Sequence, residues 1–103
     1  MKLKGKQKRY LRSQAHGMRP LFQVGKEGLT ANWLKQVEGA IEKRELLKIN
    51  VLQNAIVEDE EVIEYIEDNS QIQVVQKIGH VLVLFKQADK RENRSYSLEA
   101  AKM

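Results

Sequence analysis

Two glycines three positions apart, Gly25 and Gly28, lie between a short apolar run and a segment with helical periodicity. Such a loop can bring bare backbone N–H groups, the positive end of a helix dipole and the charge of Lys26 to one exposed place. That combination suits a phosphate group, although Glu27 weakens the attraction unless its side chain points away. The loop therefore predicts a contact with a phosphate backbone. The alternative is that both glycines only form a strand-to-helix turn.

The N-terminal segment has a second feature that suits a polyanion. From about Lys4 to Gly17 the pattern is helical, and Pro20 prevents the helix from resuming. The apolar residues on one side of the helical wheel are Leu3, Tyr10, Leu11, Ala15 and Met18. The candidate phosphate contacts on the other side are Lys6, Lys8, Arg9, Arg12 and His16. We expect a helix that packs by one face and exposes a cationic stripe on the other.

The charge is distributed unevenly along the chain, whose net charge is +4. Residues 1–48 contain 12 Lys/Arg and 4 Asp/Glu, a net +8, whereas residues 49–85 contain 1 and 7, a net −6. This asymmetry predicts a basic surface for a polyanion and an acidic surface elsewhere. The alternative is that the lysine-rich segments are only solvated helix faces.

Little in the sequence suits an enzyme. The two histidines, His16 and His80, lie 64 positions apart on different elements, and His80 is expected to be a solvated turn residue. The four adjacent carboxylates of Glu58–Glu61 point in different directions at a helix start, so they do not predict a metal site. No serine has a nucleophile motif around it, and no phosphate-binding loop ends in Gly-Lys-Ser/Thr. We predict no catalysis, no cofactor, no metal and no small-molecule substrate.

Length and composition limit the class of protein. A chain of 103 residues is long enough for one domain, and the absence of cysteine excludes disulfides and thiolate chemistry. No apolar run could span a bilayer, and the N-terminus lacks the apolar region of a signal peptide. We therefore expect a soluble cytoplasmic protein, monomeric and without a membrane partner.

The periodicities predict the order α-β-α-β-α-β-β. We expect helices over about 4–17, 30–44 and 58–69, and strands over about 20–24, 46–52, 72–77 and 81–86. The fold class is α/β, a single domain with a mixed sheet of about four strands and helices packed on it. The apolar run Val81–Phe85 predicts a central strand, paired with its predecessor through a turn at Ile78–Gly79.

Three local expectations complete this reading of the chain. Thr30 is a candidate N-cap of the second helix, and Gly39 inside that helix predicts a close packing contact. The tail from Gln87 is polar, and we expect it to be loosely ordered beyond about Leu98. The expected division is therefore a domain over 1–98 and a tail over 99–103.

Taken together in order, these motifs resemble the bacterial stand-alone CRM-domain proteins of the YhbY/YqeI family. The segments that carry the resemblance are Lys4–Arg12, Ala15–His16, Pro20, Val24–Thr30, Glu45–Ile49 and Ile78–Lys86. The resemblance covers roughly residues 4–98. It implies a fold similar to the C-terminal domain of a bacterial translation initiation factor.

The resemblance also implies a function, namely RNA binding associated with precursors of the large ribosomal subunit. The family's RNA contacts correspond to the loop of Gly25, Lys26, Glu27 and Gly28 and to the basic face around it, a KH-like use of a Gly-x-x-Gly loop. A second possibility is a protein–protein adaptor on the ribosome. It would present the acidic residues of about 58–68 to a basic partner.

Overall fold

Four strands form one mixed sheet with the spatial order β1-β2-β4-β3 in the computed structural model, which describes residues 1–103. The elements are α1 (Gly5–Ala15), β1 (Pro20–Val24), α2 (Ala31–Arg44), β2 (Leu46–Val51), α3 (Asp59–Asn69), β3 (Gln73–Ile78), β4 (Val81–Phe85), the 3₁₀ helix η1 (Arg91–Asn93) and α4 (Tyr96–Ala101). The predicted order of the first seven elements is confirmed. The last two helices were not predicted.

The sheet contains one parallel and two antiparallel strand pairs. β1 is parallel to β2, whereas β4 is antiparallel to both β2 and β3. The continuous apolar run of β4 therefore lies in the middle of the sheet, as predicted. β3 and β4 form the predicted hairpin, in which Gly79 has a φ of 59°, a conformation that favours glycine.

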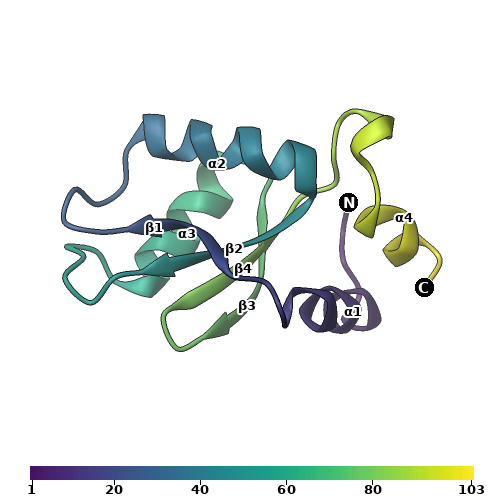
Figure 1. The fold of residues 1–103 in the computed structure, drawn as a ribbon, viewed down its shortest axis with the longest axis horizontal. Coiled ribbons are helices and arrows are strands. Elements are labelled where there is room, and N and C mark those ends of the chain that lie inside the picture. The colour runs from purple at the N-terminus through teal and green to yellow at the C-terminus, as the bar shows by residue number, and fades with distance from the viewer.

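Helices cover both faces of the sheet, so the molecule has three layers (Figure 1). Alternate residues of β2 point to opposite faces: Leu47 and Ile49 join the larger core beneath α2 and α3, and Leu46 joins a smaller core beneath α1. The smaller core includes Leu11 and Ala15 of α1 together with side chains of β3 and β4. The apolar side predicted for the first helix is thus the side that packs.

The segment after β4 is folded onto the body of the protein. Figure 1 shows α4 beside α1, where the side-chain amide of Gln7 donates a hydrogen bond of 2.9 Å to the Ala100 carbonyl. Ala100 is fully buried. The expectation of loose order beyond Leu98 is therefore wrong for residues 99–101, because α4 runs across that position. The polar composition of the tail gave no indication that this segment packs against α1.

Glu45, at the junction between α2 and β2, holds this C-terminal segment in place. Its side chain is fully buried, and its backbone has a left-handed φ of 64°. Oε1 accepts hydrogen bonds from the backbone N–H groups of Ser95 and Ser97, and Oε2 accepts one from Ala88. Burial alone would raise the pKa of Glu45, but the hydrogen bonds from these residues outweigh it and lower the pKa.

Glu42, one turn earlier on α2, binds the same segment from outside. Its carboxylate accepts from the backbone N–H of Asp89 at 2.7 Å and of Lys90 at 3.2 Å. The Asp89 hydrogen bond is the main cause that lowers the pKa of Glu42 to about 2 from 4.5. Because the folded pKa is the lower one, the stability from this contact is present above about pH 4.5 and is lost as the pH falls toward about 2.

Two local predictions for α2 have different outcomes. The Thr30 hydroxyl accepts a 3.0 Å hydrogen bond from the Trp33 N–H, so the predicted N-cap is confirmed. The close contact predicted at Gly39 is wrong. Gly39 is exposed, and no atom lies within 4 Å of the position its Cβ would occupy.

Candidate nucleic-acid interface

Gly28, in the loop between β1 and α2, has a structural role in the turn. It is buried with a φ of 69°, and a Cβ at this position would lie 3.1 Å from the Ile56 side chain. Its N–H donates a hydrogen bond of 3.0 Å to the Gly25 carbonyl. Its N–H group is therefore not available to a ligand, and the space next to its Cα is filled by Ile56. The turn interpretation thus describes Gly28.

The other half of the loop, Gly25 to Glu27, is open. The backbone N–H groups of Lys26 and Glu27 have no hydrogen-bond acceptor within the chain, and both side chains are exposed. A shallow pocket of about 240 Å³ adjoins them. Its wall is fixed by the indole of Trp33, which donates a 3.0 Å hydrogen bond to the Gln23 carbonyl. This half of the loop has the donors and the space for one phosphate group.

The two glycines should therefore respond differently to alanine. Gly28→Ala forces a side chain into a left-handed conformation and toward Ile56, so we expect the free energy of unfolding to fall by about 1–3 kcal/mol. Gly25 has no positive φ, and its Cβ would meet only Leu52 at 3.4 Å, so Gly25→Ala should cost less than about 0.5 kcal/mol. Urea unfolding followed by Trp33 fluorescence measures both values. Equal losses would contradict this assignment.

The predicted cationic side of α1 faces solvent. Lys6, Arg9, Arg12 and His16 are exposed, and Lys8 is half-buried. The Nε of Arg12 donates a 3.0 Å hydrogen bond to the Val75 carbonyl of β3, which holds this side chain over the sheet. The C-terminal end of α1 therefore directs positive charge along the sheet surface. The loop lies at the far end of β1 from this helix (Figure 1).

Between α1 and the loop, part of the sheet is left uncovered. The strand register aligns a row of side chains on the α1 side of the sheet, none of them fully buried: Gln23, Asn50, Val81 and Ile78. We call this row, with its neighbours Lys48 and Gln76, the open sheet face. Gln23 also lines the loop pocket, so the open sheet face joins the loop to the helix.

Lys48 is a candidate RNA contact that the sequence analysis did not include. The residue is only 8% exposed, and its Nζ donates a hydrogen bond to the His16 carbonyl at 3.3 Å. With Arg12, His16 and Gln76 it lines a polar pocket of about 460 Å³. The signal was present in the sequence, because Lys48 and Asn50 are the polar positions of an otherwise apolar strand. Their neighbours became evident only from the strand pairing.

The positive charge of residues 1–48 has no carboxylate partner. The lysines that form ion pairs are Lys77, Lys86 and Lys102, and none of the 12 Lys/Arg side chains of residues 1–48 lies within 4.0 Å of a carboxylate. Two of the four carboxylates in this segment, Glu42 and Glu45, accept backbone N–H groups instead. The basic charge is therefore left uncompensated.

The acidic residues lie on another surface, around α3 and the hairpin turn. Lys77 is 2.9 Å from Glu60, and this contact raises the pKa of Lys77 and lowers that of Glu60. His80 is exposed, but its Nδ1 is 2.8 Å from a carboxylate oxygen of Asp59. His80 is therefore an exposed turn residue, as predicted, and the fold also brings it next to the start of α3.

Two further observations concern metal-binding proteins and membrane-spanning proteins. No three His, Asp or Glu side chains converge on a point that could hold a metal ion. None of the helices has the length and apolar character needed to cross a membrane.

Residues 3–86 match the CRS1/YhbY (CRM) domain family, and the chain belongs to this family. The mixed four-stranded sheet, with a glycine loop after its first strand, is the α/β fold that the resemblance implied.

Curated relatives and a solved structure agree with this assignment. The chain is 47% identical over 96 residues to the probable RNA-binding protein YqeI of Bacillus subtilis, covering 93% of this chain and 98% of the relative. It is 33% identical to a Haemophilus influenzae RNA-binding protein, covering 84% and 88%. The solution structure of the hypothetical protein SAV1595 from Staphylococcus aureus is 39% identical, with a TM-score of 0.73, covering 91% of this chain and 98% of that one.

Proposed function

We propose that this protein binds RNA along a surface formed by the cationic side of α1, the open sheet face and the exposed half of the loop. The observation that carries the proposal is the set of Lys/Arg side chains of residues 1–48, none of which pairs with a carboxylate. Such charge favours a polyanion through counterion release. The relatives named as RNA-binding proteins support RNA as that polyanion.

Each part of this surface would have its own task. The free N–H groups of Lys26 and Glu27, with the Lys26 ammonium and the dipole of α2, would hold one phosphate. Arg9, Arg12 and His16 would contact successive phosphates beside the sheet. The amides of the open sheet face can donate to and accept from base edges. Binding would then rest mainly on the backbone and the shape of the RNA, with no reaction catalysed.

The proposed RNA is ribosomal RNA in precursors of the large ribosomal subunit, and the protein would act in the cytoplasm as a monomeric assembly factor. The support is the resemblance to the YhbY/YqeI proteins described from the sequence, which implies an association with those precursors. Crosslinking in cells followed by sequencing of the attached RNA tests this. Enrichment of large-subunit ribosomal RNA is the expected result. Crosslinks spread in proportion to RNA abundance would contradict it.

A second candidate is a protein–protein adaptor that presents the acidic surface of α3. The observation that favours it is the set of exposed carboxylates on this helix, of which Glu64 and Asp68 have no partner within the chain. RNase treatment separates the two. Association with ribosomal particles that survives RNA digestion would favour the adaptor.

The loop offers a direct test by charge reversal. Lys26→Glu changes the loop charge by −2 without altering either glycine, and we expect RNA affinity to fall about tenfold at about 0.1 M salt with unchanged melting. Lys35→Glu is the matched control, because Lys35 is exposed on α2, which covers the opposite face of the sheet. Glu27→Lys should tighten binding, most visibly at low salt. Equal effects of Lys26→Glu and Lys35→Glu would place the RNA elsewhere.

A further inference from the structure

A pocket separate from the loop lies at the opposite end of β1, where this strand meets the α2–β2 corner and α4. It has a volume of about 510 Å³ and shares no residue with the loop or with the pocket beneath Arg12. Its lining residues are Met18, Arg19, Leu21, Lys43, Arg44, Leu46, Leu47, Ser95 and Tyr96.

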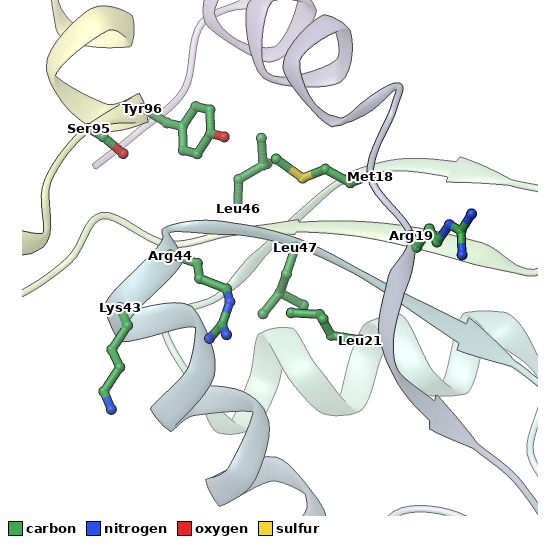
Figure 2. A pocket seen from close by; sticks show the side chains of 9 residues that line it. All are labelled: Met18, Arg19, Leu21, Lys43, Arg44, Leu46, Leu47, Ser95 and Tyr96. Carbon is green, nitrogen blue, oxygen red and sulfur yellow. The ribbon is translucent and has the colours of Figure 1, made fainter.

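The middle of this pocket is apolar, and part of it is open to solvent. Figure 2 shows Met18 and Leu46 beside Tyr96, and Leu21 beside Leu47 and Arg44 on the other side of β2 in this view. Leu46 and Leu47 are buried and form the rigid floor of the pocket, whereas Leu21 is 51% exposed. β1 is an edge strand, so no further strand lies beyond it. The exposed apolar area around Leu21 is suited to a flat, weakly polar group.

The rim of the pocket is strongly basic. Arg19, Lys43 and Arg44 are exposed and have no carboxylate within 4.0 Å. The guanidinium of Arg44 makes one long contact of 3.4 Å with the Ala40 carbonyl. The nearest carboxylates along the chain, Glu42 and Glu45, are held by the C-terminal segment. Three cationic side chains without a carboxylate partner surround an apolar pocket floor. This arrangement favours a ligand that is both flat and anionic.

We infer that this pocket binds an unpaired nucleotide of single-stranded RNA. Its nucleobase lies on the exposed side chain of Leu21, and the adjoining phosphates contact Arg19 and Arg44. The inference rests on the proposed RNA binding and extends it, because Met18 and Arg19 follow directly on the cationic end of α1. An RNA strand that leaves α1 therefore reaches the pocket without crossing an acidic surface. The sheet of this protein has no ladder of aromatic side chains on which RNA bases could stack. The apolar surface of the pocket offers a nucleobase another place to bind.

The electrostatic part of the inference is tested with a single-stranded RNA of about 12 nucleotides, within the range of site sizes of single-strand binders. Arg19→Glu with Arg44→Glu should weaken binding about twentyfold at about 0.1 M salt, because two phosphate contacts are lost. The control with the same charge change is Lys35→Glu with Lys90→Glu, whose side chains are exposed and outside the pocket. An equal loss in both double variants would overturn the assignment.

The contact between the nucleobase and the pocket is tested separately with Leu21→Ala. This side chain is exposed enough for the fold to tolerate the change. We expect about threefold weaker binding of the normal RNA and no change for an RNA of equal length whose nucleotides are abasic. If the pocket variants bind normally while Lys26→Glu does not, the pocket inference is wrong and the proposed function stands. If the unaltered protein does not bind the RNA, both are wrong. Normal RNA binding by the pocket variants together with loss of a protein partner would instead identify a protein site.

Discussion

Glu45→Ala should lower the free energy of unfolding by about 3 kcal/mol or more. The side chain is fully buried and accepts three backbone hydrogen bonds from the C-terminal segment, and a buried N–H left without an acceptor costs about 1–3 kcal/mol. Part of the loss should appear as undocking of α4. We therefore expect trypsin to cleave after Lys90 and Arg91 much faster in the variant. Urea unfolding and timed proteolysis measure the two effects.

Three further variants separate the causes of that loss. Glu45→Gln keeps the oxygen that serves Ser95 and Ser97 but turns an amide toward the Ala88 N–H, so its cost should be intermediate. Glu45→Gly should be about 1 kcal/mol less damaging than Glu45→Ala, because the φ of 64° suits glycine. Glu64→Ala, at an exposed carboxylate, should change stability by less than about 0.5 kcal/mol. If Glu45→Ala costs no more than Glu64→Ala, Glu45 does not hold the segment.

Replacing Lys6, Arg9 and Arg12 by Ala should weaken binding to many RNA sequences by about 100-fold at about 0.1 M salt. Each lost phosphate contact lowers the slope of log affinity against log salt by about 0.7 on single strands, which amounts to about fivefold per contact at this salt. The slope should therefore fall by about 2. Exposed charges contribute little to folding, although Arg12 also gives up its hydrogen bond to Val75.

The matched control for this variant removes the same charge on the other side of the molecule. Lys35, Lys90 and Arg91 are all exposed and lie outside the proposed surface, so their replacement by Ala should leave the salt slope nearly unchanged. Arg12→Ala alone, compared by urea unfolding, measures any structural share of the effect. An unchanged slope in the α1 variant would mean that this face is only solvated.

Much of the fold could be predicted from local patterns. The periodicity of α1, the N-cap at Thr30, the apolar run of β4 and the turn at Gly79 are short-range features, and the structure confirms each of them. The cationic side of α1 is predictable for the same reason, because the helix repeat alone decides which residues face away from the core. The asymmetry of charge along the chain likewise follows directly from composition.

The tertiary structure decided what depends on contacts between distant segments. Nothing in the neighbourhood of Glu45 indicates that it accepts N–H groups some 43 to 52 positions further along the chain, so the docking of α4 was missed. The strand register placed Lys48 beside His16, and the packing of Ile56 closed Gly28 while leaving Lys26 open. The sequence by itself therefore determined which residue types could meet a phosphate chain. Only the assembled sheet determined which of them share one surface, because strand pairing and burial depend on residues far apart in the chain.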